Sequence, residues 1–227
     1  MADIAATDTS PVRPPGSGPD TVRGMSLAVR EPRQRRTRQQ WATVLDAGVA
    51  ILEEGGYEAF TIPALCERAG VPPRALYARA DSKDALFLAV YEHGVRRIMQ
   101  DHAPFDDDRA WQPLSDGERI GRAVEILCDI FERNRRLLRA IVLISGAHPE
   151  VARRGVEHRA ALCAQFVSVL APIDARSAHA DPLRAREFAF ALVFSALVVR
   201  TAYGAGFGIP AGPDELTEAA SRYLLTP

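Results

Sequence analysis

Residues 61–87 read TIPALCERAGVPPRALYARADSKDALF, which predicts two short amphipathic helices separated by a tight turn. Thr61 is a good N-cap, because its hydroxyl can accept a hydrogen bond from a free amide in the first helical turn. Ile62 and Leu65 then share one helical face, and Gly70 has the backbone freedom that a sharp reversal needs. We therefore expect a helix-turn-helix, the unit that presents its second helix to the major groove of DNA.

The second helix of this unit is expected to begin at Pro72-Pro73, since proline is tolerated in a first helical turn. The residues expected on its outer face are Arg74, Ala75, Ala78 and Arg79. Asp81 or Ser82 is expected to cap a longer third helix, which has Lys83 in its first turn. A cation is unusual at a helix N-terminus, where the dipole favours acids, and a DNA phosphate lying over Lys83 would explain it.

Arg38 to Phe87 resembles the N-terminal domain of TetR-family transcriptional repressors. The likeness is carried by Thr61, Leu65-Cys66, Ala69-Gly70-Val71, Leu76-Tyr77 and Ser82-Lys83-Asp84-Ala85-Leu86. Their joint spacing is specific, whereas each short match alone would be weak. The chain departs from the family pattern at Pro72-Pro73-Arg74, which replaces Ser-x-Gly, and at Ala78-Arg79-Ala80, which replaces a His-Tyr-Phe-like triplet. These changes affect base preference and packing volume but leave the surface basic.

The pattern and the resemblance together predict a set of DNA contacts. The residues expected to make them are Arg35, Arg36, Arg38, Thr61, Arg74, Ala75, Tyr77, Arg79 and Lys83. The first three belong to a run in which five arginines between Val29 and Trp41 face a single acid, Glu31. A net charge of -1 does not argue against DNA binding, because a DNA-binding face needs only local positive charge.

Composition and motifs argue against other classes of protein. The three cysteines form no CxxC pair, the histidines lack metal-ligand spacing, and no phosphate loop or hydrolase elbow is present. The longest apolar run, Phe188 to Val199, is too short to cross a bilayer, and the first 30 residues contain no signal-peptide core. We expect a cytoplasmic protein that is not an enzyme and that has no metal, cofactor or membrane association.

The remaining periodicity predicts an all-α chain. Beyond the helix-turn-helix, helices are expected over residues 33–54, 82–101, 117–133, 137–144, 149–170, 182–203 and 213–225, with a loop over 103–114. We expect residues 1–32 to be a disordered extension. Residues 33–80 should form the helix-turn-helix DNA-binding domain, and residues 81–227 the helical effector-binding and dimerisation domain.

The resemblance also implies partners. Family members bind small molecules between their C-terminal helices, and the candidate lining residues here are Met99, Trp111, Cys128, Phe131, Phe166 and Phe194. A homodimer is expected through residues 181–203 and 213–225, and it would bind double-stranded DNA at an inverted-repeat operator. The favoured hypothesis is a repressor released by a small apolar effector. The alternative is a helical dimer, acting on DNA or in protein interactions, that a protein partner controls without a small-molecule effector.

Overall fold

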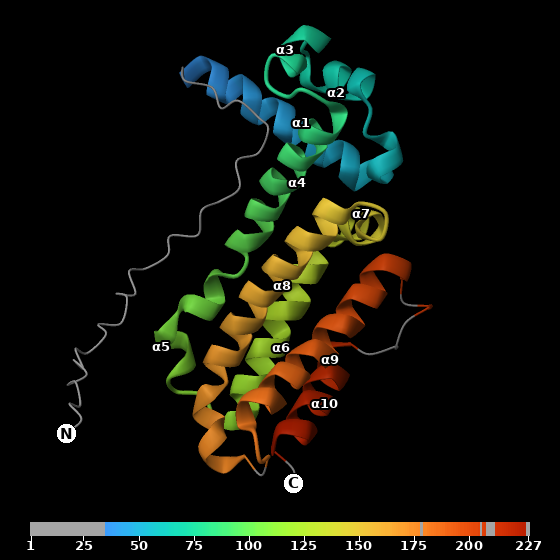
Figure 1. Cartoon of the computed structure of the whole chain (residues 1–227). Helices are drawn as coiled ribbons and strands as arrows, with labels where there is room; N and C mark the ends of the chain where they lie inside the picture. Colours follow the sequence, from blue (N-terminus) through green and yellow to red (C-terminus); the bar gives the residue numbers. More distant parts are fainter. Residues whose placement is uncertain (1–34, 178, 205, 208–211, 226–227) are drawn as a thin grey trace, which may run out of the picture.

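The computed structural model describes residues 35–177, 179–204, 206–207 and 212–225, and the regular elements in these ranges are all helices (Figure 1). The all-α prediction is therefore confirmed. One end of the molecule is formed by α1 (Arg35–Ala59), α2 (Ile62–Ala69) and α3 (Pro73–Tyr77). The segment 1–32, which was expected to be disordered, lies outside the described residues.

The residues predicted to begin and end α2 do so in the structure. The Thr61 hydroxyl accepts a hydrogen bond from the Ala64 amide at 3.3 Å, and Gly70 ends α2 in the left-handed conformation with φ of 63°. The first helix differs from the prediction. Gly56, with φ of 68°, interrupts it close to the predicted end at Glu54, but a second short helical stretch continues α1 to Ala59.

Helix α4 (Lys83–Gln100) connects the two halves of the molecule, running from the helix-turn-helix down into the C-terminal bundle (Figure 1). Its upper half crosses α1 at very short range, since a Cβ added at Gly48 would lie 2.4 Å from Val90 Cγ2. Further along, a Cβ at Gly94 would lie 2.7 Å from Leu137 Cδ2 on α7 (Arg135–Ser145). Two glycines thus permit the close helix crossings that join α4 to both neighbours.

The C-terminal half packs its helices side by side beneath the helix-turn-helix (Figure 1). Besides α4 and α7, its elements are η1 (Ala103–Asp106), α5 (Asp108–Trp111), α6 (Asp116–Arg133), α8 (Pro149–Val169), η2 (Ala171–Arg176), α9 (Pro182–Tyr203) and α10 (Pro213–Leu225). The predicted loop over residues 103–114 was wrong in part, because η1 and α5 form short helical turns there.

A capping box that the sequence analysis did not use begins α6. The Ser115 hydroxyl accepts from the Glu118 amide at 3.4 Å, and the Ser115 amide donates to the Glu118 carboxylate at 2.9 Å. These hydrogen bonds from Ser115 lower the pKa of Glu118. The Ser-x-x-Glu spacing was a usable signal, and it starts the helix one residue before the predicted Gly117.

Helix α9 is apolar on nearly every face, and the structure separates an inner side from an outer one. Phe190, Val193 and Leu197 are fully buried in the core of the chain. Phe188 and Leu192, one turn apart, are 52% and 38% exposed. An apolar helix needs cover on all sides, and within the described residues the outer side of α9 is covered only in part, since Phe188 contacts the Tyr223 ring of α10 and yet stays half exposed.

Helix α8 is tied to α4 by a partly buried ion-pair network. Arg154 donates hydrogen bonds to Glu92 on α4 and, at 2.7 Å, to Glu150 on its own helix. Burial opposes the charge on Arg154, but these hydrogen bonds outweigh it and raise the pKa of the guanidinium. Nearer the helix-turn-helix, His148 hydrogen-bonds to Asp84 at 2.7 Å, again joining α8 to α4.

We predict that Arg154→Gln destabilises the protein by about 1–3 kcal/mol, because it leaves the half-buried Glu92 carboxylate without its charged partner. Urea unfolding of Arg154→Gln, of Glu92→Gln and of the double variant that carries both substitutions would measure the interaction energy between Arg154 and Glu92. Arg153→Gln is the matched control, since Arg153 pairs with Glu150 at 2.8 Å on the exposed side of the same helix. Equal effects at positions 153 and 154 would contradict the assigned role.

Candidate nucleic-acid interface and internal cavity

The outer surface of the helix-turn-helix carries most of the side chains predicted to contact DNA. Arg74 and Tyr77 on α3 are exposed, whereas Ala75 and Arg79 are half-buried. Leu76 faces inward and is fully buried, as predicted. Because α3 has one face in the core and the opposite face open, its exposed residues form a surface that a DNA groove could accept.

Lys83 lies beside this surface, at the start of α4. Ser82 caps that helix, its hydroxyl accepting from the Ala85 amide at 3.0 Å. The Lys83 ammonium sits 4.8 Å from the centre of the Tyr57 ring, which lies on α1. This cation–π contact positions a cation that the helix dipole alone would disfavour.

The other predicted DNA contacts have different positions. Thr61 uses its hydroxyl as a helix cap, although the residue is exposed. Arg38 is exposed near the start of α1. Arg35 and Arg36 open the same helix, but their side chains lie outside the described part of the structure.

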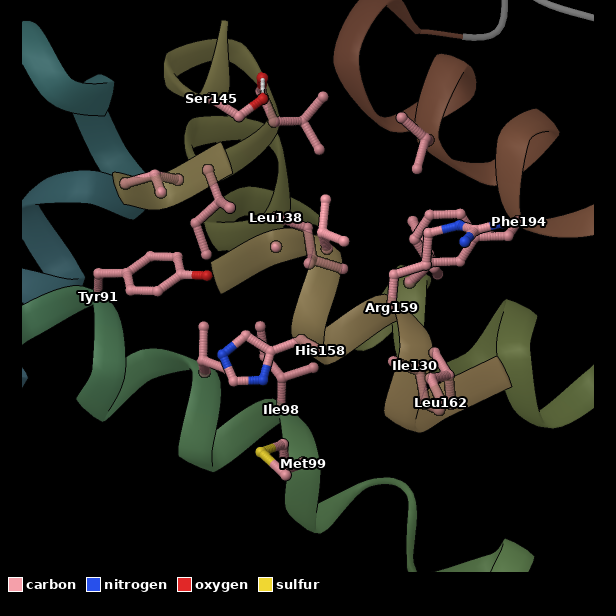
Figure 2. Close-up of a pocket in the computed structure, with 18 of the residues that line it drawn as sticks. Tyr91, Ile98, Met99, Ile130, Leu138, Ser145, His158, Arg159, Leu162 and Phe194 are labelled. Carbon is pink, nitrogen blue, oxygen red and sulfur yellow. Dashed lines mark hydrogen bonds between the residues drawn. The ribbon is translucent and has the colours of Figure 1, made fainter. Parts of the chain in front are cut away.

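A partly open cavity of about 310 Å³ lies in the C-terminal half, enclosed by α4, α6, α7, α8 and α9 (Figure 2). Three of the six predicted ligand-binding residues line it: Met99, Phe131 and Phe194. The other three lie elsewhere. Trp111 borders a separate polar depression near Arg119, while Cys128 and Phe166 are buried in the core and are not among the lining residues.

The lining is almost entirely apolar, with a few polar side chains placed among aliphatic ones. Figure 2 shows the Tyr91 hydroxyl pointing into the cavity from α4, and Arg159 extending from α8 toward the Phe194 ring. Burial raises the pKa of Tyr91, so its hydroxyl stays neutral. His102 also lines the cavity, and burial lowers its pKa, which favours the neutral imidazole.

The sequence analysis missed Tyr91, His158 and Arg159 as cavity residues. All three lie on helices that were predicted, but no local motif distinguishes them from ordinary surface or core residues. Only the packing of α4 against α8 brings them to one cavity.

Metal-binding clusters and membrane-spanning helices are two other features that a chain of this kind could carry. In the described ranges, His, Cys, Asp and Glu side chains do not gather into groups of three or more that could hold a metal ion. Nor does any helix described by the structure combine the length and apolarity needed to cross a membrane.

Comparison with known proteins identifies the N-terminal part of the fold. Residues 44–90 match the model for bacterial regulatory proteins of the tetR family, which covers most of α1 together with α2, α3 and the start of α4. Residues 44–90 therefore form a TetR-type N-terminal domain. No curated protein sequence matches it.

Solved TetR-like structures resemble the chain over most of its length. A TetR-like transcriptional regulator from Rhodococcus sp. RHA1 is 18% identical, with 86% of this chain and 96% of that one covered and a TM-score of 0.55. GusR of Salmonella enterica is 15% identical, with coverages of 82% and 96% and a TM-score of 0.60. FadR from Bacillus subtilis, solved in complex with stearoyl-CoA, is 13% identical, with coverages of 82% and 98% and a TM-score of 0.58. At these identities the likeness establishes the fold.

We predict that Lys83→Ala and Arg79→Ala weaken binding of the TetR-type domain to all duplexes by similar factors. Each substitution removes about one phosphate contact, so the slope of log affinity against log salt should become shallower by about 0.9. Arg74→Ala should instead change the preferred sequence, since Arg74 lies at the start of the recognition helix. Gel-shift titrations over a salt series measure both effects, and an unchanged salt slope in both phosphate-contact variants would contradict the assignment.

Proposed function

We propose that this TetR-family protein is a dimeric, DNA-binding transcriptional repressor that a small, largely apolar effector releases from its operator. The observation that carries this proposal is that one helix, α4, begins with Lys83, beside the surface proposed to contact DNA, and has Tyr91, Val95 and Ile98 in the cavity wall. A ligand that moves α4 in the cavity therefore also moves the positively charged start of that helix.

The link between α4 and α8 supports this coupling. Val151, Gly155 and Arg159 of α8 line the cavity, while Arg154 on the same helix pairs with Glu92 of α4. A ligand that separates or draws together these helices acts on both sides of one ion-pair network. By linkage, effector and operator must then weaken each other's affinity by the same factor.

An apolar effector fits the surroundings of the cavity. Binding pockets for small molecules are mostly apolar, with a few polar groups that orient the ligand, and about 310 Å³ is at the small end of their usual range. The fold is also compatible with ligands that carry an apolar chain, since the FadR structure from Bacillus subtilis holds stearoyl-CoA.

Dimerisation is supported by the outer side of α9. Phe188 and Leu192 are exposed there, and Phe188 lies 5.0 Å from the Tyr223 ring of α10, measured between ring centres. The two last helices thus share one partly apolar surface. A two-fold dimer through this surface would present two helix-turn-helix units, the arrangement that inverted-repeat sites require.

The first test of the function is a selection of bound sequences from a random duplex library by the full-length protein. We expect inverted repeats to be enriched, because a symmetric dimer binds two equivalent half-sites. Lys83→Ala should reduce recovery without changing the enriched motif. Binding without any enriched motif would contradict a sequence-specific regulator.

The dimer can be tested with charges placed on the two sides of α9. Phe188→Glu should leave the fold intact, dissociate the dimer at micromolar concentration and abolish inverted-repeat binding, since an unpaired charge at an interface is costly. Leu197→Glu should unfold the protein, because Leu197 is 1% exposed. Leu143→Glu is the control, since Leu143 is 50% exposed on α7. Light scattering and circular dichroism separate these results, and a wild-type monomer would refute the dimer.

A further inference from the structure

The edge of the cavity carries a permanent positive charge. The walls are aliphatic for the most part, with Val95, Ile98 and Leu162 among the lining residues, yet the Arg159 guanidinium borders the same space. An exposed arginine can contribute to solubility alone. Whether Arg159 has a role in the cavity therefore depends on which groups contact its guanidinium.

The arginines of α8 differ in their partners. Arg153 pairs with Glu150 and Glu157, and Arg154 pairs with Glu92 and Glu150. Arg159 has no carboxylate partner among the residues that the structure describes. Its guanidinium carbon lies 5.5 Å from the centre of the Phe190 ring and 5.7 Å from that of the Phe194 ring.

This placement leaves the guanidinium able to bind an anion. Stacking on an aromatic ring uses the flat face of the group, whereas its N–H donors point outward in the plane. Those donors match the two oxygens of a carboxylate. Figure 2 shows Arg159 reaching from α8 to Phe194 on α9, at one side of the cavity and across from the Tyr91 hydroxyl.

We propose that the cavity binds an amphiphilic monocarboxylate, with its aliphatic body among the apolar side chains and its carboxylate on Arg159. This inference rests on the cavity being the effector site of the proposed function, and it specifies the effector's chemical class. The apolar body supplies affinity through burial, and the carboxylate fixes the ligand's orientation at the partly hydrated edge.

The charge of the site also restricts how much negative charge a ligand can carry. A nucleotide-conjugated acyl group carries several phosphate charges, and such groups are usually bound by clusters of arginine or lysine. In the described residues around this cavity, Arg159 is the permanent cation, and His158 is its neighbour in the sequence. One cation beside about 310 Å³ of apolar space suits a free acid of modest size.

The test compares three probes of equal chain length on the full-length protein by isothermal titration calorimetry: decanoate, decanol and decyltrimethylammonium. We expect decanoate to bind about three- to tenfold more tightly than decanol, as a partly exposed charged hydrogen bond allows. Decyltrimethylammonium should bind most weakly of the three. Arg159→Gln should remove the preference for decanoate while leaving decanol binding unchanged, and Arg159→Lys should restore it in part.

Two variants serve as controls. Arg153→Gln, on the same helix but paired on the exposed side, should leave all three affinities unchanged. Glu187→Gln removes an acid that borders the same surface depression as Arg159 and should leave decanoate binding equal or stronger. Each variant is also assayed for DNA binding without ligand, where Arg159→Gln should match wild type.

The outcomes separate this inference from the proposed function. Equal binding of decanoate and decanol, unaffected by Arg159→Gln, would overturn the carboxylate assignment and leave an apolar effector site. Failure of all three probes to bind would overturn the ligand class, while operator selection would still report on DNA binding. Decanoate binding that never alters DNA affinity would uphold the site and overturn its role in release.

Discussion

The close packing of α4 against α1 and α7 is the constraint on which the rest of the structure depends. At Gly48 there is no room for a side chain, because a Cβ would lie 2.4 Å from Val90. At Gly94 a Cβ would meet Leu137 at 2.7 Å. Packed interiors transmit displacement instead of absorbing it, so α4 joins the helix-turn-helix and the C-terminal helices as a continuous element.

Polar contacts add to this packing of α4. Glu92 and Asp84 both hold partners on α8, Arg154 and His148. One contact lies at the level of the cavity and the other next to Lys83. A charged pair that is partly buried has few alternative arrangements, because separating the charges exposes each to an unfavourable environment. The relative position of α4 and α8 is therefore specified by charge as well as by apolar packing.

The cavity and the exposed side of α9 arise from a single property of that helix. Its apolar residues surround the helix axis, so Phe190 and Val193 enter the core, Phe194 faces the cavity with Phe131, and Phe188 faces outward. The same sequence thus serves packing and, in the proposed function, also ligand binding and association. This division follows from the 3.6-residue period, which turns consecutive apolar residues toward different surroundings.

Local sequence signals were sufficient for the helices and for the helix-turn-helix. Thr61, Gly70, Ser82 and Asp181 act through hydrogen bonds or backbone angles within a few residues, and the structure has each at a helix end. Such interactions depend little on the rest of the chain, which is why they could be read from residue order. The family likeness of residues 61–87 is local in the same sense.

The cavity, by contrast, was decided by tertiary structure. All six candidate residues have aromatic or sulfur-containing side chains. Met99, Phe131 and Phe194 line the cavity, whereas Trp111, Cys128 and Phe166 lie elsewhere. Apolar periodicity identifies the face of a helix that is buried but not the helix that covers it. Arg153 and Arg154 both pair with Glu150 on their own helix, whereas the aromatic rings beside Arg159 come from α9. Helix ends depend on neighbours in sequence, whereas the cavity and its charge depend on residues that are distant in sequence and close in space.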